Sequence, residues 1–98
     1  MANDAVTIAP KIHTVIFENS KVRALKVVVE PGDTAEMHSH PDNIIMVTQG
    51  GTLTMTDKNG TKEVTLTTGD TFFSDRNEHS VENKSGNTVK VIQIELKS

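Results

Sequence analysis

The sequence contains no cysteine, no tryptophan and no tyrosine, and aromatic residues make up only 3% of its 98 residues. Without cysteine, the chain has no disulfide framework, no thiolate metal site and no cysteine nucleophile. Its apolar runs are too short to cross a membrane, and its first residues lack the basic stretch and apolar core of a secretory signal. We therefore expect a cytoplasmic protein with no membrane partner.

Charge of either sign is also modest, with 10 basic and 13 acidic residues and a formal net charge of -3. Because the basic residues are scattered among more numerous acids, the sequence argues against a nucleic-acid partner and favours a small-molecule ligand or substrate. Hydrophobic residues make up 35% of the chain, which is typical of a globular protein. The length predicts a single domain over residues 1–98 with one modest core.

Turn-forming residues recur at short intervals, and the runs between them are rich in Val, Ile, Thr and Phe. Residues 21–30 are apolar on both faces, which indicates a strand covered on both sides. Residues 52–56 and 64–67 alternate cleanly and flank Asn59-Gly60. This pair predicts a tight hairpin with both residues at positive φ.

Residues 44–49 and 88–96 are further predicted strands, and no window has the period and length of a helix. About eight short strands would use nearly the whole chain in an all-β sandwich or barrel. Residues 1–15 are the exception, and we expect them to form an N-terminal arm or an edge strand.

Three of the four histidines stand where they can bind one ion together. His38 and His40 are two residues apart, so their rings project from the same face of a strand. His79 follows the hairpin, on a segment that can return beside them in an antiparallel fold. Such a site leaves coordination positions open. We expect the fourth histidine, His13, to be a surface or edge residue.

The residues around these histidines resemble the two motifs of the cupin family. The first motif covers 32–50 and contains His38-Ser39-His40-Pro41, and the second covers 69–83 and contains His79. The resemblance implies a double-stranded β-helix, or jelly-roll, barrel from about residue 21 onward. It also implies that His38, His40 and His79 bind a divalent transition metal, one of Fe, Mn, Ni, Cu or Zn.

The chain departs from the family pattern at several positions. Asn43 replaces the usual glutamate ligand, and an amide oxygen would leave the ion with its full +2 charge. Asp42 could supply the missing carboxylate if the turn is shifted, and Asn83 is a further candidate ligand or supporting residue. In the second motif, Asp75 and Asn77 replace a proline and a glycine; Asn77 tolerates the left-handed conformation of the glycine.

Family alignment and strand alternation also predict which residues line the barrel. The predicted lining residues are Arg23, Leu25, Met37, Asn43, Ile45, Val47, Gln49, Phe73, Val81 and Gln93. Either Phe73 or Phe72 faces inward and forms an apolar wall with Met37 and Met46. Arg23 faces a substrate carboxylate or, in the interpretation that we favour, pairs with an acid such as Glu82 or Asp70.

The resemblance implies three candidate functions. We slightly favour a metal-dependent enzyme acting on a small organic molecule, either dioxygenase-like with iron or a Lewis-acid catalyst such as an isomerase. The alternative is a non-catalytic metal or small-ligand binding module, which suits the missing glutamate. Metal-free epimerase chemistry with a histidine base ranks last. We also expect a homodimer, because a small barrel commonly covers a sheet edge or apolar face with a second copy.

Overall fold

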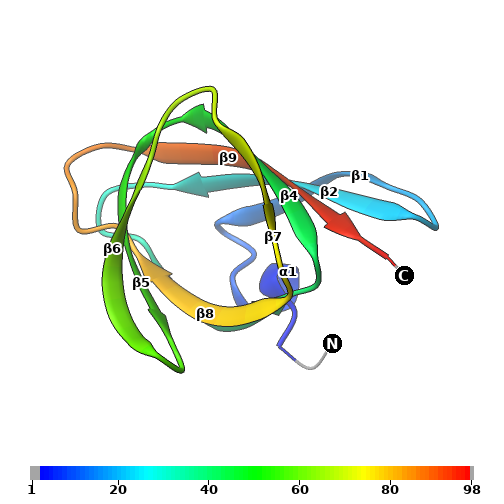
Figure 1. Ribbon diagram of the computed structural model, residues 1–98, viewed down its shortest axis with the longest axis horizontal. Helices are drawn as coiled ribbons and strands as arrows, with labels where there is room; N and C mark the ends of the chain where they lie inside the picture. Colours follow the sequence, from blue (N-terminus) through cyan, green and yellow to red (C-terminus); the bar gives the residue numbers. More distant parts are fainter. Residues whose placement is uncertain (1–2, 98) are drawn as a thin grey trace.

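The computed structural model describes residues 3–97, and antiparallel strands dominate it (Figure 1). Short β-branched runs form the strands and Gly, Asn and Asp occupy many of the turns between them, as the sequence pattern predicts. The elements in chain order are α1 (Ala5–Ile8), β1 (His13–Glu18), β2 (Val22–Val29), β3 (Thr34–His40), β4 (Asn43–Gln49), β5 (Gly51–Asp57), β6 (Gly60–Leu66), β7 (Thr71–Ser74), β8 (Asn77–Glu82) and β9 (Val89–Leu96).

The strands form two sheets that curve around a common interior (Figure 1). One sheet has the order β1-β2-β9-β4-β7, and the other has the order β3-β8-β5-β6. The predicted all-β double-stranded β-helix is therefore confirmed. Because β3 pairs with β8 and β9 lies between β2 and β4, residues far apart in the sequence become direct neighbours.

The β5–β6 hairpin confirms the predicted hairpin, but its turn differs from the prediction. Asp57 pairs with Gly60, so that Lys58 and Asn59 form the loop. Gly60 has a φ of 114°, and no described residue other than glycine has a positive φ. The left-handed conformation expected at Asn59 is therefore wrong, because the glycine, which lacks a Cβ, takes the strained position in this hairpin. Asn77, which could tolerate the same conformation, does not adopt it.

The N-terminal segment consists of a short helix followed by an edge strand. Asp4 caps α1 by accepting hydrogen bonds from the backbone N–H groups of Val6 and Thr7. The helix lies beside β3, and the chain then enters β1, which pairs only with β2 at the edge of the larger sheet. Within the described residues, no helix is long and apolar enough to cross a membrane.

The apolar core lies between the two sheets and is built mainly from the inward faces of their strands. The expectation that residues 21–30 are covered on both sides is not met, because Lys26 on the outer face of β2 is exposed, whereas Leu25 is completely buried. Its neighbours alternate between the interior and the outer face, which explains the period of two in the sequence. The core cluster comprises Ala9, Ile12, Leu25, Val27, Val29, Ala35, Val47, Leu53, Val81, Val89 and Val91.

Candidate metal centre and ligand cavity

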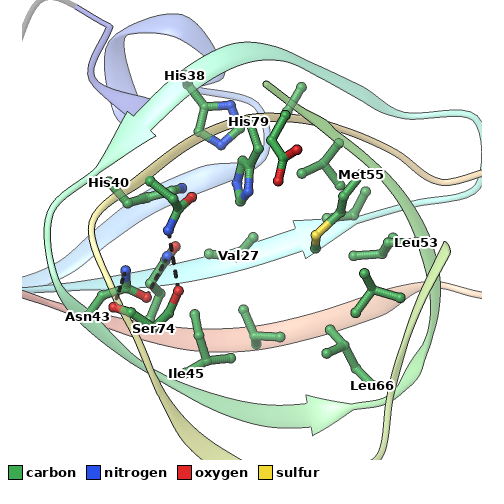
Figure 2. Close-up of a pocket in the computed structure, with 18 of the residues that line it drawn as sticks. Val27, His38, His40, Asn43, Ile45, Leu53, Met55, Leu66, Ser74 and His79 are labelled. Carbon is green, nitrogen blue, oxygen red and sulfur yellow. Dashed lines mark hydrogen bonds between the residues drawn. The ribbon is translucent and has the colours of Figure 1, made fainter. Parts of the chain in front are cut away.

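A cavity of about 700 Å³ opens between the two sheets. Polar and apolar side chains line different parts of it (Figure 2). A largely apolar cavity with a few converging polar groups is typical of small-molecule sites. The polar part includes His38, His40, His79, Asn43 and Ser74, and the apolar part includes Val27, Leu53, Met55 and Leu66.

Three strands bring all four histidines together beside this cavity. His38 and His40 lie on β3, and the β3–β8 register places His79 directly opposite His38. The ring centroid of His79 lies 4.8 Å from that of His38 and 5.4 Å from that of His40. His13, at the start of β1, approaches from the other sheet, 5.1 Å from His38 and 5.5 Å from His40.

His13 does lie on the edge strand β1, as one of the two expectations had it, but the expectation that it is a surface residue is wrong. Its side chain is only 4% exposed and lines the cavity. The ring nitrogens available from His13, His38 and His40 all lie within 4.8 Å of one another, which is compatible with binding a single ion. The feature that shows that His13 faces inward is its pairing with Val27. Paired residues share a face of the sheet, and Val27 points inward. That register cannot be read from the sequence alone.

Hydrogen bonds fix the tautomers of three of these histidines. In each ring, Nδ1 faces an acceptor, so Nδ1 carries the proton and Nε2 keeps its lone pair. The Nε2 atom of His38 is buried and has no hydrogen-bond partner among the described residues. The three Nδ1–H groups donate to Ala9 O at 3.1 Å from His13, to Glu36 O at 2.6 Å from His38, and to Glu95 Oε2 at 2.7 Å from His40.

Burial in this environment keeps His13, His38 and His79 neutral. Burial is the main cause that lowers the pKa of His13 to about 4 and that of His79 to about 3, and nearby histidines contribute to both shifts. Burial also lowers the pKa of His38. Since a metal ligand must be a neutral imidazole, these rings can bind an ion at pH 7 without first releasing a proton.

Three charged side chains, Asp4, Arg23 and Glu95, form a connected network next to the histidine cluster. Its central residue, Glu95, was not predicted from the sequence. The Nε of Arg23 donates to Glu95 Oε1 at 2.8 Å, and Nη2 of Arg23 donates to Asp4 Oδ1 at 2.6 Å. Burial alone would raise the pKa of Glu95, but hydrogen bonds from His40 and Arg23 outweigh it and hold that pKa below its usual value.

Arg23 therefore forms the structural ion pair that we favoured, although its partners differ from those named. Glu82 and Asp70 are wrong as its partners; the acids are Glu95, directly across the β2–β9 ladder, and Asp4 from the cap of α1. Arg23 does not line the cavity. Its guanidinium is instead used to hold Glu95 and the N-terminal segment.

Asn43 is buried at the predicted place beside the cavity, but its amide is already engaged. Its Nδ2 donates to Pro41 O at 2.8 Å, and its Oδ1 accepts from Gln93 Nε2 at 3.0 Å. Its oxygen is therefore occupied by an internal hydrogen bond. Asp42 lies outside the cavity lining, and its Oδ1 accepts from the backbone N–H of Arg76 at 2.8 Å.

Asn83 does not line the cavity and instead makes hydrogen bonds that stabilise the fold. It is completely buried, and its Nδ2 donates to Val29 O at 2.9 Å and to Asn87 O at 2.8 Å. These bonds tie the end of β2 to the loop before β9. Asn77 likewise stabilises a turn, because its Nδ2 donates to Asp75 O at 2.8 Å.

The strand alternation places Ile45, Val81 and Gln93 in the cavity lining, and these residues do line it. Val47 and Leu25, which were also predicted to do so, instead pack in the apolar core. Both face inward, so their direction follows the alternation. The cavity does not extend as far as their side chains.

Three other predicted lining residues point away from the cavity. Irregular registers at Ala35/His38 on β3 and Val47/Gln49 on β4 break the period of two, so Met37 and Gln49 are exposed. Phe73 is also exposed, and Phe72, paired with Ile45, lines the cavity instead. Met46 lies on the outer face of β4, so Met55 provides the sulfur in the wall.

The fold and this site define a class: a double-stranded β-helix with a histidine cluster inside the barrel. The family model for the cupin domain matches residues 25–95, and the chain belongs to the cupin family. No curated protein matches the sequence.

Among solved structures, a cupin domain from Bordetella pertussis is 27% identical, with a TM-score of 0.83 over 89% of this chain and 93% of that chain. A cupin-2 domain protein from Shewanella frigidimarina is 25% identical, with a TM-score of 0.59 over 86% and 78% of the two chains. The polyketide cyclase RemF from Streptomyces resistomycificus is 18% identical, with a TM-score of 0.66 over 88% and 64%, a likeness of fold alone.

Proposed function

We propose that this cupin binds one divalent transition metal through His13, His38, His40 and His79 and acts as a metal-dependent enzyme on a small organic molecule. The observation that carries the proposal is the buried Nε2 atom of His38, which has no hydrogen-bond partner among the described residues. A buried polar atom without a partner is costly, and a metal ion would supply one.

The donor set fits a borderline metal such as Fe²⁺, Co²⁺, Ni²⁺ or Zn²⁺, which imidazole nitrogens bind well. His38 and His40 belong both to the family motif and to the tightest group of ring nitrogens, so we assign them the central role. His13 and His79 would complete the set from β1 and β8. With neutral ligands only, the ion would attract an anionic ligand group.

The cavity supports a small organic ligand whose anionic group faces the histidines and whose apolar part contacts Leu53, Met55 and Leu66. The lining also includes two exposed cationic side chains, Lys62 and Arg76, and the acids Asp57, Asp75 and Glu78. The bound metal would supply Lewis-acid chemistry or, in the case of iron, dioxygen chemistry. The chain itself would position the ligand and exclude water from its apolar part.

A non-catalytic metal or ligand binding module is the second candidate. It is favoured by the state of Glu95, the carboxylate that accepts a hydrogen bond from His40, because Arg23 also holds it and it is therefore not free to move a proton. Of the acids that line the cavity, Asp75 and Glu78 are exposed and Asp57 is half-buried, so none of them is enclosed as Glu95 is.

The test compares metal-loaded wild type with a His38→Ala variant against a panel of small carboxylates and enolisable ketones. Ligand binding is read from the visible absorption of the Co²⁺ form, and turnover from product formation and dioxygen consumption by the Fe²⁺ form. Turnover that requires His38 supports the enzyme. Binding without turnover supports the binding module, and the absence of any binding contradicts both candidates.

A further inference from the structure

The outer face of the five-stranded sheet carries an apolar row that crosses every strand. Paired residues share a face of a sheet, so the registers define the row directly. Phe17 pairs with Ala24, Ala24 with Ile94, Ile94 with Ile44, and Ile44 with Phe73. The row therefore runs from edge strand β1 to edge strand β7 through the central strand β9.

This row lies outside the barrel, because the adjacent row faces inward. Leu25, Gln93, Ile45 and Phe72 form that inner row, and three of them line the cavity. Successive residues of a strand point to opposite faces. Phe17 and Phe73, at the two ends of the outer row, are each 55% exposed.

The next outer row is mixed and continues the apolar surface only at its centre. Thr14 pairs with Lys26, Lys26 with Ile92, Ile92 with Met46, and Met46 with Thr71, so Ile92 and Met46 are its apolar residues. Ile16, beside Phe17 at the register shift of β1, is 53% exposed. Lys26 is the only charged residue in these two rows. The outward positions of a solvent-facing sheet are ordinarily polar, and the row from Phe17 to Phe73 has no polar residue.

The other sheet of the same molecule provides the contrast. Its outer row consists of Thr34, Glu82, Thr54 and Glu63, joined by the registers of β3, β8, β5 and β6. The chain thus places threonine and glutamate on one outer face and isoleucine and phenylalanine on the other. Contiguous exposed apolar patches of this kind mark an interaction surface.

We propose that a second copy of this chain covers the outer face of the five-stranded sheet. The row is apolar from edge to edge and ends in phenylalanine on both sides, so it is self-complementary under a two-fold axis over β9. Two such sheets stack face to face as aligned layers, as in a β-sandwich. This inference does not depend on the proposed metal site, which lies on the opposite face of the sheet.

The area of the face meets the requirement of a stable dimer. Its strands contain 6, 8, 8, 7 and 4 residues. With strands about 4.8 Å apart and about 3.3 Å per residue, each copy contributes on the order of 500 Å² of flat area. Two copies reach the roughly 1,000 Å² that a specific interface requires, before side-chain relief is counted.

The first experiment measures mass by sedimentation over a concentration series of wild type, Met46→Lys, Phe73→Lys and a control, Thr54→Lys. The first two changes place a charge on the apolar face at exposed positions, whereas Thr54 lies on the outer face of the other sheet. We expect a wild-type dimer, a dissociation constant raised by at least roughly 30-fold in both face variants, and no change in the control.

A second measurement needs no substitution. In a sample that mixes isotope-labelled and unlabelled chains, isotope-filtered NOEs should connect Ile44, Ile94 and Phe73 methyl or ring protons across two copies. Wild type that remains monomeric at millimolar concentration would overturn the proposal. So would a dimer that survives both face variants while they stay folded, or one whose intermolecular NOEs arise from the edges of β1 or from the threonine-rich face.

Discussion

Glu95 Oε2 accepts a hydrogen bond from His40 Nδ1 at 2.7 Å, and both side chains are almost completely buried. A carboxylate in this position fixes the tautomer of the imidazole and makes its other nitrogen a better metal ligand. Glu95 in turn is held by Arg23, across the β2–β9 ladder. The metal affinity of His40 should therefore depend on residues that do not contact the metal.

Replacing Glu95 with glutamine should weaken metal binding by roughly 10–100-fold, because the amide keeps the size of the side chain but loses its charge. The measurement is a competitive Zn²⁺ titration with a chelating indicator, beside the thermal unfolding midpoint. Glu63→Gln, on the polar outer face, is the matched control and should bind like wild type. Equal affinity in Glu95→Gln and wild type would show that Glu95 does not position His40.

Single alanine substitutions of the four histidines show which of them bind the metal. His38→Ala and His40→Ala should abolish binding, because these two residues belong both to the set predicted with His79 and to the group formed with His13. His13→Ala and His79→Ala should each weaken binding beyond the roughly 10–100-fold loss expected for a supporting contact. Metal titrations of all four variants provide the comparison. If His13→Ala binds like wild type, His13 fills the cavity wall without contributing a ligand.

The Asp4–Arg23 ion pair predicts a pH dependence of stability. Burial alone would raise the pKa of Asp4, but the hydrogen bond and charge of Arg23 outweigh it and hold the pKa below 3.8. A group with a lowered folded-state pKa stabilises the protein above its unfolded pKa, and this contribution is lost as the pH falls through the folded value.

Asp4→Asn should therefore lower the free energy of unfolding at pH 6 and reduce the additional loss between pH 5 and pH 3. Urea unfolding at both ends of this range measures the effect. Lys11→Ala, which breaks a different surface pair with Asp33, should leave the contribution of Asp4 unchanged. A variant that loses as much stability on acidification as wild type would contradict this role for Asp4.

Asn83→Ala should destabilise the fold without affecting the metal site. The substitution leaves the carbonyl of Val29 without the buried donor Nδ2, at a cost of about 1–3 kcal/mol, and removes a second bond to the carbonyl of the exposed Asn87. Denaturant unfolding measures the loss, with Lys58→Ala in the exposed hairpin turn as control. Metal content reduced in proportion to a lost ligand would instead indicate that Asn83 binds the ion.

The sequence carried enough information for the fold and for the meeting of His38, His40 and His79. Alternation and turn residues are local signals, and the two histidine motifs have a characteristic spacing. His13 and Glu95 were missed because their roles depend on register. Only the pairing of β1 with β2 turns His13 inward, and only the β2–β9 ladder places Glu95 beside Arg23.

The predicted lining failed where the strands depart from ideal alternation. A register shift in β3 exposes Met37, and it accompanies the hydrogen bond from His38 to the Glu36 carbonyl. On β7, a shift of one residue determines whether Phe72 or Phe73 faces the cavity, because successive residues of a strand point to opposite faces. Such shifts are set by tertiary packing, which propensity and period do not encode.

The most direct test of the central claim is the metal content of the purified protein, measured by elemental analysis on wild type and on His38→Ala and His40→Ala. The account predicts about one divalent transition-metal ion per chain in wild type after loading, and none in either variant. Wild type that retains no Fe, Mn, Co, Ni, Cu or Zn, or variants that retain as much as wild type, would contradict it.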